Sequence, residues 1–164
     1  MKRVIEKVKD IVEICPFTHL EDFAADPRLT LSGYRFTDVT SDLLSKWIDR
    51  VVSVQRGQGT TLALAGFRGV GKSHFLAVLA AIVSRPELRG GILDPHVASS
   101  ADRLSRRHGG VVFVRRGAGT SLEDELRSAI GEAFGINPGT LTESLTDLLP
   151  MASQLSGETP PVIL

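Results

Sequence analysis

The sequence predicts an α/β fold of three layers, with a mainly parallel sheet in the middle and a helical lead-in before it. The first indication is a short apolar run, residues 60–65, followed by a glycine-rich loop and then by apolar residues at helical spacing. The second is a pair of further apolar, β-branched runs at 111–114 and 162–164. We expect the lead-in to comprise residues 1–56 and the core, incomplete at its C-terminus, to comprise residues 57–164.

Length and composition fit one domain and argue against several classes of protein. The chain has 164 residues, 42% of them hydrophobic, which is enough for one sizeable core. Its 19 basic and 19 acidic residues cancel, so no global positive charge indicates nucleic acid or an anionic membrane as partner. The longest apolar run, residues 75–83, is less than half of the roughly 20 residues that cross a bilayer. A single cysteine, Cys15, and an N-terminus unlike a signal peptide favour a reducing, cytoplasmic setting.

The lead-in is predicted to be mainly helical. Apolar residues between positions 4 and 14 fall at helical spacing, and Pro16 ends that pattern. Residues 17–33 show no clear period and are expected to form an irregular connection, while residues 34–36 are a possible short strand. A second helix is expected to begin at the capping residues 40–42. Its apolar face would comprise Leu43, Leu44, Trp47, Ile48, Val51 and Val52.

The core is predicted to continue with a helix after the glycine-rich loop, ended by Pro86. The largely polar stretch 87–110 is expected to be a long surface excursion, with a short helix around 101–107. It is also the segment we expect to be most mobile.

Two capping boxes predict the helices that follow. The first, residues 120–123, opens a helix that Gly135 should end, and the second, residues 140–143, opens a short helix that runs to Pro150.

One motif carries chemistry. The residues Gly66-Phe67-Arg68-Gly69-Val70-Gly71-Lys72-Ser73 match the P-loop pattern G-x-x-x-x-G-K-S/T. Glycines let the backbone approach phosphate oxygens closely, and the following helix adds the positive end of its dipole. The ammonium of Lys72 suits the β and γ phosphates, where it is the candidate catalytic group, and the hydroxyl of Ser73 suits Mg²⁺. The sequence therefore predicts a site for a nucleoside triphosphate, with ATP and Mg²⁺ as the cofactors.

The residues around the fixed motif positions allow two interpretations each. The variable positions are Phe67, Arg68 and Val70. Arg68 either touches a phosphate or faces solvent, and solvent is favoured because P-loops do not require a cation there. His74 either helps to position substrate or packs on the first helical turn. Tyr34 and Phe36 either border the adenine or belong to the core.

Hydrolysis also requires an acidic residue at the tip of a neighbouring strand, together with Mg²⁺. The run 111–114 is followed by Arg115 and Arg116, and the apolar lead before Asp94 is too short for a strand. The run 162–164 stops before any acid, so we expect the chain to be truncated within its Walker B strand.

Three segments together resemble a known group of proteins. Residues 4–13, the segment Tyr34-Arg35-Phe36-Thr37-Asp38 and residues 66–76 resemble the start of large bacterial P-loop ATPases of the BREX and Pgl phage-defence systems, relatives of the AAA+ and STAND ATPases. The resemblance implies that ATP hydrolysis in the full-length protein drives a conformational switch, with protein partners or self-assembly. The Walker B, sensor and arginine-finger residues of that group lie downstream and have no counterpart here.

Two other classes remain open. One is a small-molecule kinase, although such enzymes usually carry the P-loop near the N-terminus and here 65 residues precede it. The other is a non-hydrolysing nucleotide-binding module whose contact surface is a local basic cluster. The cluster comprises Arg103, Arg106, Arg107, His108, Arg115 and Arg116. ATP is favoured over GTP because Asn137 is the only asparagine and no Asn-Lys-x-Asp motif is present.

Overall fold

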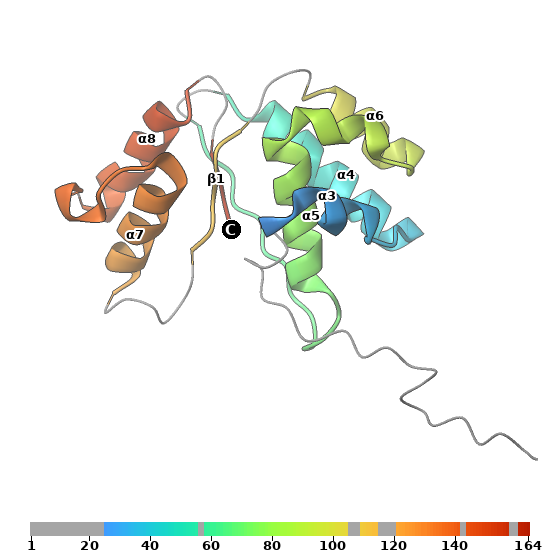
Figure 1. Ribbon diagram of the computed structural model, residues 1–164, viewed down its shortest axis with the longest axis horizontal. Coiled ribbons are helices and arrows are strands. Elements are labelled where there is room, and N and C mark those ends of the chain that lie inside the picture. Colours follow the sequence, from blue (N-terminus) through green and yellow to red (C-terminus); the bar gives the residue numbers. More distant parts are fainter. Residues whose placement is uncertain (1–24, 56–57, 105–108, 115–120, 142–143, 158–160) are drawn as a thin grey trace, which may run out of the picture.

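The structure, a computed structural model, describes residues 25–55, 58–104, 109–114, 121–141, 144–157 and 161–164. Its helices are α3 (Pro27–Ser32), α4 (Asp38–Ser53), α5 (Lys72–Ser84), α6 (Pro95–Asp102), α7 (Leu122–Phe134) and α8 (Leu145–Leu155). Its other elements are the 3₁₀ helices η1 (Pro86–Gly91) and η2 (Pro138–Thr140) and the strands β1 (Val111–Val112) and β2 (Val162–Ile163). Helices α3 to α6 lie on one side of the strands, and α7 and α8 lie on the other (Figure 1).

The predicted three-layer α/β core with a mainly parallel sheet is wrong. Helices dominate the described part of the chain, and its sheet has two strands. Residues 60–65, the expected central strand, form no ladder, and of them Leu64 alone is half-buried while the others are exposed. A parallel strand exists only through hydrogen bonds to a neighbouring strand. A short apolar run indicates a preference for burial, but it does not provide that neighbour.

The two other expected strands do form, and they pair in parallel. Val111 lies opposite Val162, and Val112 lies opposite Ile163. The pairing continues at the C-terminal side, where Leu164 N donates to Val112 O at 2.8 Å. Side chains alternate between the two faces of this ribbon. Val111, Val162 and Leu164 pack with α3 to α6, whereas Val112, Val114 and Ile163 pack with α7 and α8.

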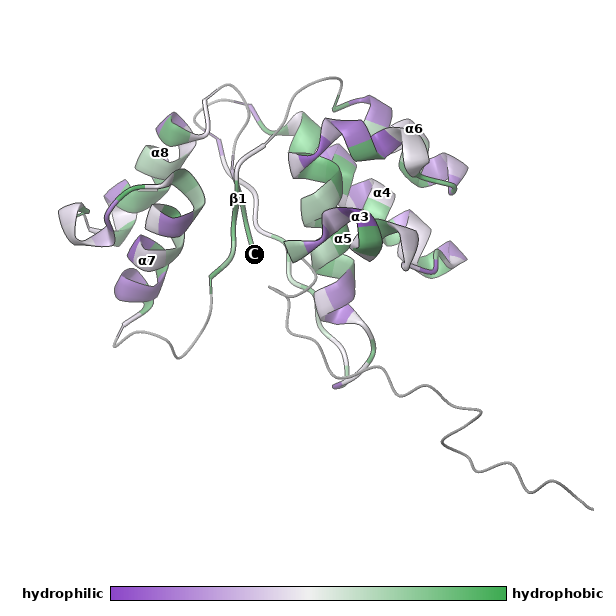
Figure 2. Cartoon of the chain, in the orientation of Figure 1, coloured by the Kyte–Doolittle hydropathy of each residue, from purple (hydrophilic) through white to green (hydrophobic). Residues whose placement is uncertain are grey.

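Helix α5 is the most buried element, and its prediction is confirmed. Figure 2 shows it hydrophobic over most of its length. Its buried residues are Phe75, Ala77, Val78, Leu79, Ala80, Ala81, Ile82 and Val83. They cover all sides of the helix, as in a helix surrounded by protein. Lys72, Ser73 and His74, which are not buried, form the first turn, so this end of α5 leaves the core.

The other end of α5 is satisfied by a buried arginine. The last carbonyls of a helix have no partner within it. Arg89, in η1, supplies two: its Nε donates to Ile82 O at 2.8 Å and its Nη2 to Val83 O at 3.0 Å. Burial lowers the pKa of this guanidinium, an effect that Glu87 opposes. Arg89 thereby fixes the turn that follows α5.

The lead-in is more ordered near α4 than the sequence suggested. Residues 17–33, expected to be irregular, contain α3, which Asp26 caps through Leu29 N at 2.9 Å. The possible strand at 34–36 is absent, because this segment leads into the cap of α4. That cap is Thr37, three residues earlier than expected, in a reciprocal capping box with Thr40. The helix expected at 4–14 lies outside the described residues.

The stretch 87–110 is not the surface excursion that its polarity predicted. It contains η1 and α6, and Val97 and Ala101 of α6 are fully buried against the α5 core. The helix begins at Pro95, well before the expected position 101, because Asp94 and Pro95 act as cap and first helical residue. Small alanine and serine residues between the apolar ones let α6 approach α4 closely, which hydropathy alone does not reveal.

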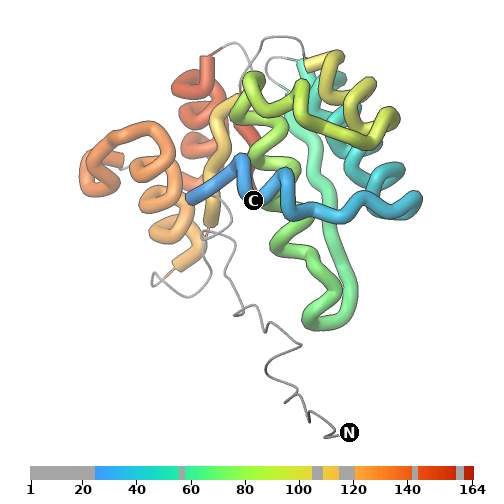
Figure 3. The backbone as a smooth tube through the Cα atoms, turned by 45° about the vertical axis from the view of Figure 1, so that its right-hand side comes forward, coloured from blue at the N-terminus to red at the C-terminus, as the bar shows by residue number. Residues whose placement is uncertain are grey.

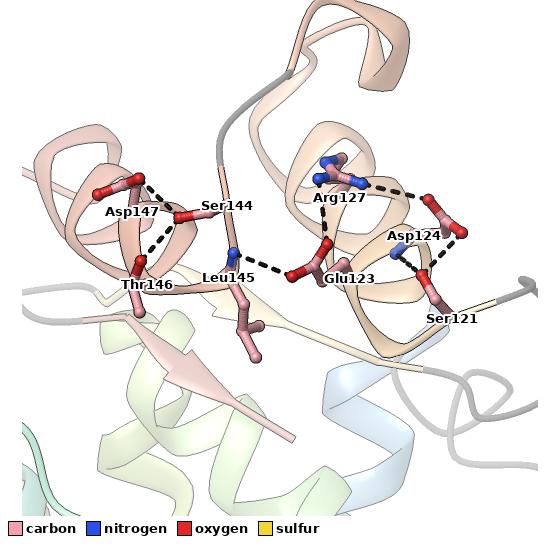
Figure 4. Close-up of polar contacts among 8 residues, drawn as sticks. All are labelled: Ser121, Glu123, Asp124, Arg127, Ser144, Leu145, Thr146 and Asp147. Carbon is pink, nitrogen blue, oxygen red and sulfur yellow. Dashed lines mark hydrogen bonds and ion pairs between the residues drawn. The ribbon is translucent and has the colours of Figure 1, made fainter.

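A chain of polar contacts ties the start of α7 to the start of α8 (Figure 4). The cap of α7 is Ser121, whose Oγ accepts from Asp124 N at 3.1 Å, one residue later than the predicted box. Arg127 pairs with Asp124 at 3.2 Å and with Glu123 at 3.5 Å. A Glu123 carboxylate oxygen accepts from Leu145 N at 3.4 Å. The contacts fix how the two helices pack.

Helix α8 begins and ends later than expected. Its cap is Ser144, not a residue of the box at 140–143, and it continues through Pro150 to Leu155. Proline lacks the N–H that would bond to the preceding turn, and its presence normally ends a helix. Leu148 and Ala152 are fully buried on either side of Pro150. Packing of these two residues against α7 maintains the helix past the proline.

Gly131 provides a test of the packing at the end of α7. The chain turns back at Gly135, which has the left-handed conformation expected of a helix stop (φ 67°), and Ile136 N donates to Gly131 O at 2.8 Å. A Cβ on Gly131 would lie 2.6 Å from Ile136 O and 2.7 Å from Pro138 Cγ. Alanine therefore cannot fit without moving this turn.

We expect Gly131→Ala to lower the free energy of unfolding by about 1 kcal/mol or more, because overpacking outweighs the gain of about 1 kcal/mol in helix propensity. Urea denaturation measures this change. Ser128→Ala, at an exposed position of the same helix, is the control and should change stability by less than about 0.5 kcal/mol. A stabilising Gly131→Ala would contradict the close approach.

Candidate phosphate-binding loop

The glycine loop (residues 66–73) leads into α5 at the end of the molecule opposite α6. Figures 1 and 3 both show it projecting beyond the helices. Phe67 is 88% exposed and Val70 is 60% exposed, so side-chain packing does not determine the shape of the loop. Arg68 is exposed as well, as its solvent-facing interpretation predicted. The loop is therefore held in place by the first turn of α5, the helix into which it leads.

Two glycines set the backbone conformation of the loop. Gly69 has φ 83° and Gly71 has φ 86°, values that strain any residue with a Cβ. Gly71 is also the N-cap of α5 and makes no side-chain hydrogen bond to it. Most helices use Ser, Thr, Asp or Asn at this position to satisfy the first N–H groups. A glycine leaves the N-terminal end of α5 open to an anion from outside the helix.

The ammonium of Lys72 lies over the loop itself. Its Nζ donates to Gly66 O at 2.9 Å and to Phe67 O at 2.8 Å. The sequence predicted that this group would be directed towards phosphates, and the structure brings it to the backbone that would surround them. Hydrogen bonds from an ammonium to neutral carbonyls are weaker than those to phosphate oxygens, which carry charge. Phosphate can therefore replace these carbonyls as acceptors.

Ser73 is the second residue of α5 and is exposed. Its hydroxyl is a hard oxygen ligand of the kind Mg²⁺ accepts, and Mg²⁺ usually keeps several waters and is bound partly through substrate phosphates. Across the described ranges no group of three or more His, Cys, Asp or Glu is arranged to hold a metal ion. Ser73 is thus the residue of this loop whose hydroxyl could contribute to holding a magnesium ion.

The side chain of His74 is directed away from the loop. Its Nε2 lies 3.0 Å from Thr30 O in α3, and its ring meets Tyr34 edge to face at 5.0 Å. Tyr34 in turn meets Phe36 at 5.1 Å in the same geometry. Burial raises the pKa of Tyr34, an effect that a hydrogen bond to Thr40 opposes. Of the two interpretations of His74, the structure supports packing on the first turn of α5.

The sequence could not reveal the contact between His74 and Thr30. The two residues are 44 positions apart, and the acceptor is a backbone carbonyl, which leaves no trace in residue identity. The only available signal was Asp26 followed by Pro27, a helix-start pattern within the stretch expected to be irregular.

The carboxylate of Asp94 already has partners. Its Oδ1 caps α6 by accepting from His96 N and Val97 N, both at 3.0 Å, and its Oδ2 accepts from Ser41 Oγ at 2.7 Å. These contacts hold α6 against α4. Asp94 therefore has a structural role at the start of α6.

Only one member of the basic cluster is described, Arg103. Its guanidinium pairs with Asp49 of α4 at 2.6 Å and donates to Ser100 Oγ at 3.1 Å. Arg103 thus joins α6 to α4 and is engaged within the fold. The remaining members lie outside the described residues.

Comparison with known proteins gives no match for this chain among family descriptions, curated proteins or solved structures. In the part of the chain that the structure describes, none of the helices has both the length and the apolar character needed to cross a membrane. What the chain binds must therefore be inferred from the glycine loop itself.

Asp94→Ala should lower the free energy of unfolding at pH 7 by about 1–2 kcal/mol, because it removes the cap of α6 and the acceptor for Ser41. Asp94→Asn is the matched variant. It keeps a capping oxygen but not the charge, so we expect a smaller loss. Urea denaturation of the three proteins measures both differences.

The same variants test a pH dependence. Hydrogen bonds from Val97 N, and further from Ser41 and His96, lower the pKa of Asp94 in the folded protein. Its stabilisation is thus fully present above the unfolded pKa of about 3.9 and is lost as the pH falls through the lower folded pKa. The stability difference between wild type and Asp94→Asn should be constant from about pH 7 to 5 and shrink below about pH 4. A pH-independent difference would contradict this account.

Proposed function

We propose that this chain binds Mg-ATP through the glycine loop, residues 66–73. The observation that supports this most directly is the conformation of that loop. Two glycines with positive φ lead into the uncapped end of a buried helix, and a lysine ammonium is folded over the loop backbone. Each of these features favours an anion with several closely spaced oxygens.

Triphosphate binding follows from a replacement of acceptors. Phosphate oxygens take the place of Gly66 O and Phe67 O at the Lys72 ammonium. The resulting bonds join an ionised donor to an ionised acceptor and gain the attraction between opposite charges, which the bonds to neutral carbonyls lack. The partial positive charge at the N-terminus of α5 adds to this attraction. Since α5 is largely buried from residue 75 to residue 83, the helix behind these donors is already formed before the nucleotide arrives.

Mg²⁺ is the metal proposed to accompany the nucleotide. Ser73, exposed in the first turn of α5, would hold it through its hydroxyl. When bound, the ion neutralises part of the charge on the phosphates. Lys72 would stabilise the charge that develops on the transferred phosphoryl group, which makes it the candidate catalytic residue.

We further propose that the bound ATP is hydrolysed when a carboxylate from outside this loop activates the attacking water. Hydrolysis would then drive a conformational motor or switch. The resemblance to phage-defence ATPases supports a cytoplasmic protein that acts in anti-phage defence with protein partners or by self-assembly. A second candidate is a non-hydrolysing nucleotide-binding module. It is favoured by one observation: Asp94, an acid considered from the sequence as a Walker B residue and set aside, is occupied as a helix cap.

Lys72→Ala should weaken Mg-ATP binding at least about tenfold, because the variant lacks the ammonium that would donate hydrogen bonds to the phosphate oxygens. Isothermal titration of the full chain measures the affinity. Arg68→Ala is the control, since it removes a positive charge from an exposed position of the same loop and should change the affinity less than about threefold. Equal affinities of wild type and Lys72→Ala would overturn the proposal.

Ser73→Ala tests the metal separately. Wild-type protein should bind ATP more tightly with Mg²⁺ than with EDTA. Ser73→Ala should lose most of that difference, because the variant lacks the hydroxyl ligand. Titrations under both conditions, with wild type and variant, give the comparison. An unchanged Mg²⁺ effect in the variant would show that Ser73 does not hold the ion.

A further inference from the structure

The first turn of α5 forms part of the glycine loop. One side chain of that turn, His74, also contacts α3 in the lead-in. His74 is the third residue of α5, so its main chain lies in the turn that begins at Gly71. Its ring, however, reaches Thr30 O at 3.0 Å. The carbonyl of Thr30 lies in the last turn of α3, where helix carbonyls need hydrogen-bond donors from outside the helix. One residue thus takes part in both structures.

The position of this ring is fixed from two directions. Tyr34, just after α3, meets it edge to face at 5.0 Å, and Thr30 itself is buried. Tyr34 is supported by Phe36 at 5.1 Å. A ring held by a hydrogen bond and by an aromatic contact cannot shift without disturbing α3 or the turn at residues 33–34, in which Tyr34 N donates to Leu31 O at 3.2 Å and which we call the Tyr34 turn. Conversely, a shift of the first turn of α5 is transmitted to those segments.

We propose that His74 is a positioning residue that couples occupancy of the glycine loop to α3 and the Tyr34 turn, an inference that rests on the proposed binding of Mg-ATP. Phosphate binding orders the first turn of α5. Because His74 lies in that turn and contacts the Thr30 carbonyl, α3 becomes more ordered as well. In the opposite direction, α3 holds the turn in the conformation that binds phosphate. Coupling between two sites is reciprocal, so both effects follow from one free energy.

Three variants at position 74 separate the two contacts. His74→Ala removes both. His74→Gln keeps a side-chain donor at a length similar to that of Nε2 but removes the ring. His74→Phe keeps an aromatic ring against Tyr34 but removes the donor. Arg28→Ala, at an exposed position of α3, is the control for changes in α3 that do not involve the contact.

Hydrogen exchange reports the state of α3. The amides of Thr30, Gly33 and Tyr34 are hydrogen-bonded within the α3 segment, at 2.9, 2.9 and 3.2 Å. Their exchange is therefore slowed in the folded protein and changes when the segment opens. Exchange is measured for each protein with and without saturating Mg-ATP, and affinity is measured by isothermal titration.

In the wild-type protein, Mg-ATP is expected to slow exchange of these three amides further. His74→Ala should lose that nucleotide-dependent slowing and bind Mg-ATP about tenfold more weakly. His74→Gln should restore most of both effects, whereas His74→Phe should not. A purely structural role would raise exchange of His74→Ala equally with and without nucleotide, which leaves the slowing by Mg-ATP intact.

The outcomes distinguish this inference from the proposed function. If wild-type protein and Lys72→Ala bind Mg-ATP equally, the proposed function fails and this inference fails with it. If wild type binds Mg-ATP but His74→Ala retains both its affinity and the slowing at α3, only the coupling is overturned. A loss in Arg28→Ala equal to that in His74→Ala would also overturn it, because the effect would then not depend on the Thr30 contact.

Discussion

The burial of helix α5 is the constraint on which the rest of the structure depends. A helix that is apolar on all sides must be surrounded, and here α3, α4, η1 and β1 surround it. Its polar first turn is the only part that can leave the core. The orientation of the glycine loop is therefore set by hydrophobic packing about residues 75–83, which lie behind the loop in the core.

Charged side chains at the edges of this core mostly serve helix ends. Arg89 satisfies the last carbonyls of α5, Asp94 caps α6, and Arg103 joins α6 to α4. Lys72 differs from them, because its acceptors belong to an exposed loop and lack support from packed side chains. Its partners can be exchanged without opening the core. This difference separates a residue suited to ligand binding from residues that hold the fold.

Sequence patterns that act over a few residues were sufficient to predict much of the molecule. The apolar face of α4, the helix α5, the stop at Gly135 and the glycine loop all depend on neighbours within one or two turns. The strands at 111–114 and 162–164 were predictable because they are β-branched and apolar. The candidate loop was found for the same reason, since its glycines determine its conformation locally.

The failures concern interactions between distant segments. Residues 60–65 have the composition of a strand but form no ladder, so the sheet in the described part of the chain has two strands. Pro150 should have ended α8, yet packing of Leu148 and Ala152 outweighs the lost hydrogen bond. The contact of His74 with Thr30 uses a carbonyl that every residue carries. None of these outcomes follows from a pattern along the chain.

Because side chains of the β1–β2 ribbon alternate between two hydrophobic cores, the packing of both cores depends on the register of the ribbon. A slip of one residue in either strand would exchange the faces of that strand and send, for example, Val112 towards α5 and Val111 towards α7. Both cores would lose matched side chains at the same time. Two short strands have few hydrogen bonds with which to specify their alignment. The helices on both sides supply the missing specificity, so a two-stranded parallel pair, a weak element by itself, has a single alignment.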